Sequence, residues 1–326
     1  MSLVYNRLMG QKQTEKNRIL IVGGAGFIGY EFVKLLTSGE SFEVHVVDCD
    51  ASRLSQLDLP VPSKHFVDAS DAKGMSKLIS DNSFDGLVHL AANSDIKSGS
   101  VSSELDFQNT LITSLVLSEI VKVRHFKFLL FASTSAIYGE KNEPISLQEK
   151  TSNFPISKYG WAKLASEYAL SASAAISNTP FALVRFPNVV GPNPTHGLLF
   201  DLKAKLLRNS KALEILGNGQ QRKPFLHVAD LCEVLVRSLQ VTSEGSNLEL
   251  NVGPGDTISV SEIVEMVVEI TTLNPAIHYG SEPFGWPGDV PSYEYADKLP
   301  NQFADLQIRN SAKAVRDSFE SYWNMT

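Results

Sequence analysis

The sequence predicts an α/β fold: a doubly wound parallel β-sheet with helices on both faces, followed by a smaller mixed α/β domain toward the C-terminus. Two observations predict it. Short apolar runs rich in β-formers alternate with helix-patterned segments through the first half of the chain, and such repetition makes a parallel sheet covered on both faces. A glycine-rich loop also separates the first strand from the first helix, where open α/β sheets form their ligand crevice.

The individual elements follow from the spacing of apolar residues. We expect strands at 18–22, 44–47, 87–90, 126–131 and 181–186, which are short and largely apolar. We expect helices at 30–36, 72–79, 105–121 and 159–175, where apolar residues recur near helical spacing. The segment 248–253 is typical of a strand that returns to the sheet. The first domain is therefore predicted over 18–184, rejoined by part of 225–253, and the second over 185–326.

Composition excludes several classes of protein. The chain has 326 residues, 43% of them hydrophobic and 20% charged, as in ordinary globular proteins. Its formal net charge of −7 argues against nucleic acid or an anionic membrane as a partner. No apolar run approaches the roughly 18 residues of a membrane span, and the polar start lacks a secretory signal, so we expect a cytoplasmic protein. Cys49 and Cys232 are too few and too scattered for a disulfide framework or a zinc site, and we expect no metal.

The glycine-rich loop has a specific spacing. ILIVGGAGFIGYEF (19–32) places Gly23, Gly26 and Gly29 between a strand and a helix. These glycines permit a tight turn, a close approach of backbone to a pyrophosphate, and close packing of helix on strand. The helix N-terminus then presents free N–H groups and the positive end of its dipole to phosphate. The loop therefore predicts a Rossmann-type dinucleotide-binding domain.

Asp48 ends the second expected strand, 19 residues after Gly29. This is the expected place for an acid that binds the adenosine ribose. Because a carboxylate there repels a 2′-phosphate, Asp48 favours NAD over NADP. Arg53 lies several residues further on and weakens that preference only slightly.

KYGWAK (158–163) places Tyr159 and Lys163 four residues apart on one face of an expected helix. Hydride transfer from a carbinol to NAD needs a base for the hydroxyl proton. A tyrosine with a pKa near ~10 needs a shift of roughly three units, or about 4 kcal/mol, to serve at neutral pH. A lysine cation at about 6 Å supplies on the order of 3 kcal/mol at an effective dielectric near 20. We expect Lys163 and the oxidised cofactor together to make Tyr159 a base.

Three hydroxyl residues, Ser133, Thr134 and Ser135, follow the apolar strand 126–131. They lie at the carboxyl edge of the predicted sheet, where ligands bind in open α/β folds. We expect Thr134 or Ser133 to hold and orient a substrate hydroxyl. The alternative is that these hydroxyls only cap the next turn.

Together these motifs resemble the extended short-chain dehydrogenase/reductase family, specifically its NAD-dependent nucleotide-sugar epimerases of the UDP-galactose 4-epimerase type. The resemblance runs from residue 19 to about 297. It includes GGAGFIG (23–29), VHLAA (88–92), STSAIYG (133–139), YGWAK (159–163), RFPNVVGP (185–192), FLHVADL (225–231) and NVG (251–253). Several independent motifs in the same order make the resemblance specific for the family.

The resemblance implies a set of site residues, NAD as cofactor and a nucleotide-diphosphate sugar as ligand. The implied catalytic residues are Thr134, Tyr159 and Lys163. The implied cofactor contacts are Gly23, Gly26, Phe27, Ile28, Gly29, Asp48, Asp68, Ala69, Leu90, Ala91, Ala92, Asn109, Ser133, Tyr159, Lys163 and Pro187. The implied substrate contacts are Thr134, Asn188, Lys223, Arg222 and Tyr293.

Ala136 bears on the reaction. Related 4,6-dehydratases and decarboxylating members of the family carry an acid just after the hydroxyls, and here Ser135 and Ala136 occupy those places. Neither side chain can act as an acid near neutral pH, which disfavours dehydration and decarboxylation. The resemblance therefore implies a 4-epimerase that oxidises the sugar at C4 and returns the hydride to the other face.

Two departures from the family pattern fall on the substrate side. Lys223, beside Arg222, stands where the family usually has an arginine, and Trp286 stands where a second arginine is expected. Lysine is a point charge and cannot bind a diphosphate bidentately as arginine does. We expect Lys203, Lys205 or Arg222 to compensate; the alternative for the first two is a solvated helix face. His227 is expected to be structural.

Other functions remain open at this stage. The same catalytic residues would serve a nucleotide-sugar 4-ketoreductase or dehydrogenase, or a 4,6-dehydratase, and the fold alone would serve a non-catalytic dinucleotide sensor. Family members are commonly dimers formed through a helix bundle. The expected helices 105–121 and 159–175 are apolar enough for this, so we predict a homodimer.

Overall fold

The computed structural model describes residues 16–93, 103–141, 143–146, 151–286, 288–296 and 299–325. At its centre lies a seven-stranded sheet in the order β12-β7-β5-β4-β1-β2-β3, in which all neighbouring strands are parallel. The strands are β1 (Asn17–Val22), β2 (Phe42–Asp48), β3 (Ser63–Phe66), β4 (Gly86–His89), β5 (Phe128–Thr134), β7 (Phe181–Phe186) and β12 (Leu248–Asn251). The predicted Rossmann-type α/β fold is confirmed.

Helices cover both faces of the sheet because its strands are apolar on both faces. Along β1, Ile19 and Ile21 belong to one buried cluster and Leu20 and Val22 to another. The first cluster is covered by α2 (Phe27–Thr37), α3 (Ala51–Gln56) and α10 (Val228–Ser243). The second is covered by α4 (Ala72–Asp81), α7 (Thr113–Val123) and α8 (Lys158–Ile176).

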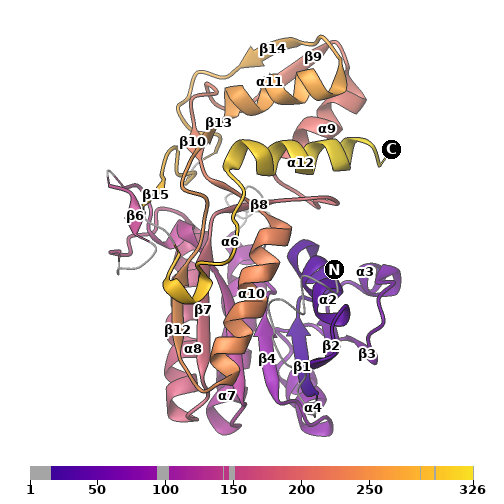
Figure 1. The fold of residues 1–326 in the computed structure, drawn as a ribbon, viewed down its shortest axis with the longest axis vertical. Helices are drawn as coiled ribbons and strands as arrows, with labels where there is room; N and C mark the ends of the chain where they lie inside the picture. The colour runs from indigo at the N-terminus through magenta and orange to yellow at the C-terminus, as the bar shows by residue number, and fades with distance from the viewer. Residues whose placement is uncertain are drawn as a thin grey trace.

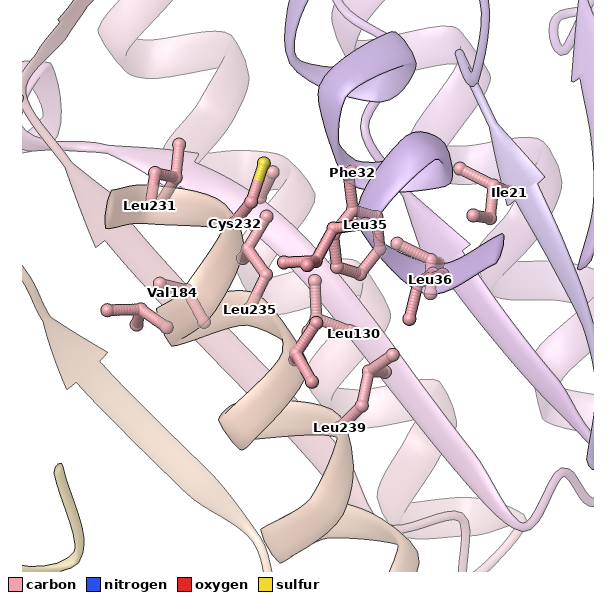
Figure 2. Packing of buried hydrophobic residues seen from close by; sticks show 14 of the residues in the cluster. Ile21, Phe32, Leu35, Leu36, Leu130, Val184, Leu231, Cys232, Leu235 and Leu239 are labelled. Atoms are coloured by element: carbon pink, nitrogen blue, oxygen red, sulfur yellow. The ribbon is translucent and has the colours of Figure 1, made fainter. Parts of the chain in front are cut away.

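The helices α2 and α10 pack together although they are far apart in the sequence (Figure 1). Figure 2 shows side chains of both helices gathered over the sheet: Phe32, Leu35 and Leu36 from α2, Leu231, Leu235 and Leu239 from α10, and Leu130 and Val184 from the strands. Each of these eight buried apolar side chains contributes about 1.5–3 kcal/mol on burial. The cluster therefore fixes α10, which follows β11, against the first half of the chain.

The rest of the chain forms a smaller α/β part above the carboxyl edge of the sheet (Figure 1). Its helices are α9 (Leu198–Arg208), α11 (Val260–Thr271) and α12 (Ser311–Trp323), which share a separate apolar cluster. Short strand pairs join it: β9 (Ala212–Ile215) with β14 (Ala276–Tyr279), β10 (Arg222–Lys223) with β13 (Ile258–Ser259), β8 (Asn188–Val190) with β11 (Phe225–His227), and β6 (Ile145–Ser146) with β15 (Tyr295–Ala296). The remaining short turns are η2 (Ser135–Ile137) and η3 (Asn301–Phe303). The division into two domains at residue 185 stays a prediction.

The segment predicted as one helix at 105–121 is instead interrupted. It consists of α6 (Ser103–Asp106), a π-helical stretch η1 (Phe107–Ile112) and α7. The hydroxyls of Thr113 (2.9 Å) and Ser114 (2.8 Å) donate to the carbonyl oxygen of Thr110. The carbonyl oxygen of Thr110, which lies within the wider turn, is thus hydrogen-bonded by two side chains. π-helical turns of this kind are frequent at functional sites. Apolar spacing could not reveal the interruption.

Two elements between β2 and α4 were not predicted. α3 is a single short helix, and β3 has an alternately half-buried and exposed sequence, SKHF. β3 lies at the edge of the sheet, so it needs no apolar run of its own. Among the described residues, no helix has the length and apolar character required to cross a membrane.

His227 caps α10. Its ring Nδ1 accepts a hydrogen bond from the backbone N–H of Ala229 at 3.1 Å, so that nitrogen must be unprotonated. Burial, with Arg309 nearby, lowers the pKa of His227 to about 4. The expectation of a structural histidine agrees with this position.

We predict that the free energy of unfolding falls as the pH drops from about 6.5 to about 4. In that window the unfolded chain binds a proton that folded His227 does not bind, so acidification favours unfolding. The loss is at most about 3 kcal/mol. Denaturant titrations at several pH values should show a smaller loss in His227→Asn, which keeps a capping oxygen but does not titrate. An equal loss in both proteins would contradict the assignment.

Candidate active site

A cavity of about 410 Å³ lies at the carboxyl edge of the sheet, lined by both parts of the chain. It brings together most of the predicted site residues. Those that line it are Gly23, Gly26, Phe27, Ile28, Gly29, Asp48, Asp68, Ala69, Leu90, Ala91, Ala92, Asn109, Thr134, Tyr159, Pro187, Asn188, Lys223 and Tyr293. Ser133, Lys163 and Arg222 are not among the lining residues.

The glycine loop follows β1 and lies against the residues that follow β4, so three segments of chain approach closely. Gly23 has φ +81°, and a Cβ there would lie 2.7 Å from the backbone nitrogen of Ala91. A Cβ on Gly29 would lie 2.3 Å from the carbonyl oxygen of Gly23. Both positions therefore require glycine for backbone conformation or space. Gly26 precedes α2 and supplies no side-chain cap, and the first turn of α2 carries no acidic residue.

Asp48 connects the loop to the next strand. One carboxylate oxygen accepts a hydrogen bond from the backbone of Ala25 (3.1 Å) and the other from that of Asp50 (3.1 Å). The carboxylate is thus fixed at the wall of the cavity, beside Arg53. Arg53 is itself paired with Asp50, at 3.2 Å.

These residues fit a dinucleotide with an unphosphorylated ribose. The uncapped N-terminus of α2 offers backbone N–H groups to a pyrophosphate, and Asp48 offers oxygens to ribose hydroxyls. The arrangement fits NAD better than NADP, because Asp48 would repel a 2′-phosphate.

Thr134 and Tyr159 meet at the cavity. Thr134 ends β5 and its Oγ1 accepts from the backbone N–H of Ala136 at 3.1 Å, so it also caps the next turn. A hydrogen bond from Thr134 favours the ionised phenol of Tyr159. Burial and the charge of Asp106 act more strongly, however, and raise the pKa of Tyr159 above its usual range. The sequence argument expected a lowered pKa; within the chain alone its direction is upward, because desolvation disfavours the phenolate.

Lys163 lies one turn after Tyr159 on α8 but does not line the cavity. It is 2% exposed, donates to the carbonyl oxygen of Ala132 at 2.8 Å, and lies 4.6 Å from the centre of the Phe131 ring. Burial lowers the pKa of Lys163 to about 7, and Glu167 acts in the opposite direction. The charge of Lys163 near neutral pH therefore depends on its surroundings.

Ser133, predicted as a cofactor contact, is fully buried and donates to Glu167 on α8. Side chains alternate along a strand, so adjacent Ser133 and Thr134 face opposite sides of β5. Only Thr134 faces the cavity. The prediction for Ser133 is corrected accordingly.

On the substrate side, Ala136, Asn188 and Tyr293 line the cavity. The hydroxyl of Ser135 donates to that of Tyr293 at 3.0 Å. The two positions after the catalytic hydroxyl thus carry no acid. Ser135 is hydrogen-bonded to Tyr293, and Ala136 has no polar side-chain group.

Lys223 and Trp286 lie between this cavity and a second one of about 210 Å³, since both residues line both cavities. Lys223 forms an ion pair with Asp289 and lies 5.3 Å from the centre of the Trp286 ring. The lysine charge is therefore balanced by a buried carboxylate that the sequence reasoning did not assign. In the sequence it is marked only by its place three residues after Trp286.

The cations expected to compensate lie elsewhere. Arg222, predicted as a substrate contact, pairs with Glu262 at 2.9 Å on the surface, outside both cavities. Lys203 donates to the carbonyl oxygen of Tyr322 and so holds α12. Lys205 lines the second cavity and donates to the carbonyl oxygen of Glu214 at 2.7 Å. Arg222 and Lys203 line neither cavity, so the prediction that they compensate for the missing arginines at the substrate is wrong.

Asp106 was also missed. It is 2% exposed and accepts from Asn93 at 2.7 Å, and burial raises the pKa of its carboxyl group. It does not line the cavity, so it does not take the place of an acid at Ala136. No sequence motif marks it, because it acts on Tyr159 from a different helix, α6. No cluster of three or more metal-ligating side chains occurs among the described residues.

The doubly wound sheet, the glycine loop and the cavity above it define a dinucleotide-binding α/β enzyme. Residues 19–253 match the NAD dependent epimerase/dehydratase family, and the chain belongs to this family. The predicted family resemblance and the predicted cofactor, NAD, are confirmed.

Relatives with assigned reactions are similar over most of the chain. The chain is 28% identical to UDP-arabinose 4-epimerase 1 of Arabidopsis thaliana over 294 residues, which covers 80% of this chain and 69% of that one. A crystal structure of a UDP-galactose 4-epimerase is 30% identical, with a TM-score of 0.81, covering 93% of this chain and 98% of that one. A UDP-glucose 4-epimerase from Thermotoga maritima, crystallised with UDP-glucose, is 26% identical, with a TM-score of 0.80 over 94% and 99%.

We predict that Asp48→Asn weakens NAD binding roughly tenfold, since a neutral amide replaces a charged acceptor. Discrimination against NADP should fall by at least as much, because the repulsion of a 2′-phosphate is removed. Calorimetric titration of cofactor-free protein with NAD and NADP measures both. Asp50→Asn is the matched control: it lines the same cavity and keeps a capping oxygen. Unchanged discrimination in Asp48→Asn would exclude the proposed ribose contact.

Proposed function

We propose that this protein is an NAD-dependent nucleotide-sugar 4-epimerase. The observation that carries the proposal is the hydroxyl pair of Thr134 and Tyr159 in a cavity shared with the glycine loop, with Ala136 in place of an acid. Three relatives whose names specify UDP-sugar 4-epimerases support it. Bound NAD supplies the acceptor and donor of hydride at C4.

The chain's own residues handle the proton. Thr134 and Tyr159 together hold the C4 hydroxyl, and Tyr159 takes its proton during oxidation and returns one during reduction. Because burial opposes the phenolate, the cation of Lys163 and the charge of the oxidised nicotinamide must both favour it. Epimerisation needs no second acid, in keeping with Ala136.

The substrate extends toward the second cavity in this proposal. Asn188, Lys223 and Trp286 line both cavities, so a diphosphate between them would join a sugar at Tyr159 to a nucleoside in the second cavity. Lys223 is the cation available at this junction, but Asp289 offsets its charge. We therefore infer diphosphate binding with one lysine and neutral donors rather than an arginine fork.

We predict redox-neutral isomerisation when the purified protein is incubated with UDP-, dTDP-, GDP- and CDP-hexoses. Chromatography and mass spectrometry should show a new sugar nucleotide of unchanged mass. Loss of water would identify a dehydratase, and stoichiometric consumption of free reduced cofactor would identify a ketoreductase.

Tyr159→Phe should lower kcat by about 10²–10⁴-fold, the usual contribution of a positioned acid–base group. Binding of NAD should be nearly unchanged, because the ring is kept. The matched control is Tyr279→Phe, an exposed tyrosine of β14 that lines neither cavity. If Tyr159→Phe turned over the substrate at the normal rate, the proposed mechanism would be wrong and a dinucleotide sensor would gain support.

We also propose a homodimer, located in the cytoplasm, formed through α7 and α8. These helices pack against each other and expose large apolar side chains, among them Leu115, Trp161 and Tyr168. Burying them against the same helices of a second copy would remove that apolar surface from water.

We predict that Leu115→Lys combined with Tyr168→Lys converts a dimer to a monomer in sedimentation experiments. The charges would be desolvated in the interface but harmless on a free surface. Val123→Lys is the control, since this exposed valine lies at the end of α7. A monomeric wild-type protein would contradict the proposed assembly.

A further inference from the structure

Four charged side chains of alternating sign form a row from the active site to the surface: Lys163, Glu167, Arg185 and Glu249. The first three are 2%, 3% and 6% exposed. Lys163 and Glu167 lie on α8, Arg185 on β7 and Glu249 on the edge strand β12. The proposed reaction assigns a task only to Lys163.

The contacts along the row are specific. Arg185 binds Glu167 bidentately, with Nε to Oε1 at 2.9 Å and an Nη to Oε2 at 2.7 Å. Its other Nη donates to Glu249 at 2.7 Å and to the Tyr138 hydroxyl at 3.0 Å. Glu167 also accepts from the hydroxyl of Ser133. Such a bidentate pair fixes the orientation of the carboxylate as well as its charge.

Glu167 is the charged residue whose field favours the charged form of Lys163. The two residues are one turn apart on α8, and they bind consecutive residues of β5: Lys163 the carbonyl of Ala132, and Glu167 the hydroxyl of Ser133. Charges four residues apart on a helix face each other. A buried ammonium group loses its hydration, and a fixed carboxylate nearby is what favours its charged form.

We propose that Glu167 and Arg185 are positioning residues that keep Lys163 protonated, one helical turn from Tyr159. Arg185 fixes the orientation of the Glu167 carboxylate by its bidentate ion pair, and Glu167 in turn stabilises the Lys163 cation. The inference rests on the proposed function for the task of Lys163, but the charge of Lys163 can be measured without turnover. The proposal also gives Ser133 a role away from the cavity, because its hydroxyl donates a hydrogen bond to Glu167.

Other titratable groups around Lys163 do not supply the counter-charge. On β4, His89 is fully buried and burial lowers its pKa, so it is neutral. On α8, Tyr159 is a phenol whose pKa the chain raises. On α6, Asp106 raises the pKa of Tyr159 but is held by Asn93. Glu167 is thus the carboxylate of the described chain that faces Lys163, with Arg185 behind it on β7.

The test compares pH profiles of kcat/KM and of NAD affinity for the wild type and Glu167→Gln. Glutamine keeps the shape and an acceptor but removes the charge, so Lys163 should lose its proton at lower pH. We expect the alkaline limb of both profiles to move down by about one pH unit, which is a tenfold change in the protonated-to-neutral ratio of Lys163. A merely structural loss would lower the profiles without moving the limb.

Glu249→Gln is the matched control, because it removes a charge from the same row at its exposed end. Its limb should coincide with that of the wild type. If Glu167→Gln does not fold, the double variant Glu167→Gln, Arg185→Met replaces it, since removing both members of a buried pair is better tolerated than removing one. Its limb should move in the same direction by a smaller amount.

An unmoved limb in a folded Glu167 variant would overturn the inference, and so would an equal movement in Glu249→Gln. The outcomes separate from those of the proposed function. A shifted NAD profile in a protein without epimerase activity supports the inference and rejects the reaction, whereas epimerisation with unmoved limbs does the reverse.

Discussion

The architecture of the site depends on one steric constraint, the close approach of three chain segments at the carboxyl ends of β1 and β4. The backbones of Gly23 and Ala91 are too near for a side chain between them, and α2 starts directly against the Gly23 carbonyl at Gly29. A larger residue at either position would separate the helix from the sheet. Because the contact holds, the N-terminus of α2 faces the cavity and Asp48 lies within reach of the loop.

Burial has opposite chemical consequences for the two functional side chains of α8. It raises the pKa of Tyr159 and lowers that of Lys163, so in both cases it favours the neutral form. A base made from this pair therefore needs compensating charge from outside the pair. At the cavity, Thr134 favours the phenolate through a hydrogen bond rather than a charge, and the Glu167–Arg185 pair lies on the opposite side of β5. The strand separates a reactive face from a supporting face by the alternation of its side chains.

The substrate side of the cavity carries less positive charge than it would if unpaired arginines lined it. Asp289 balances Lys223, and Trp286 contributes a ring rather than a charge. A diphosphate in this place would be bound mainly by shape and hydrogen bonding. Binding should then depend less on ionic strength than it does where unpaired arginines face the phosphate.

The sequence alone determined the fold class and the cofactor from local patterns, and the family resemblance implied about half of the residues that line the cavity. A glycine spacing, an acid at a strand end and a tyrosine–lysine pair have the same meaning wherever the chain places them. It also identified His227 as structural. The interruption of the helix at 105–121 escaped it, because hydroxyl groups bound to a carbonyl leave no trace in apolar periodicity.

Only the tertiary structure decided which charges meet. Ser133 and Thr134 are neighbours in sequence but face opposite sides of β5, and Arg222 and Lys223 are neighbours of which only Lys223 reaches the cavity. Glu167 and Arg185 come together from a helix and a strand, and Lys223 and Asp289 from segments far apart in the chain. Desolvation and pairing depend on distances between such segments, which no local pattern encodes. The residue types that the reaction needs could therefore be predicted from the sequence, whereas the pKa values of Tyr159 and Lys163 depend on the tertiary structure.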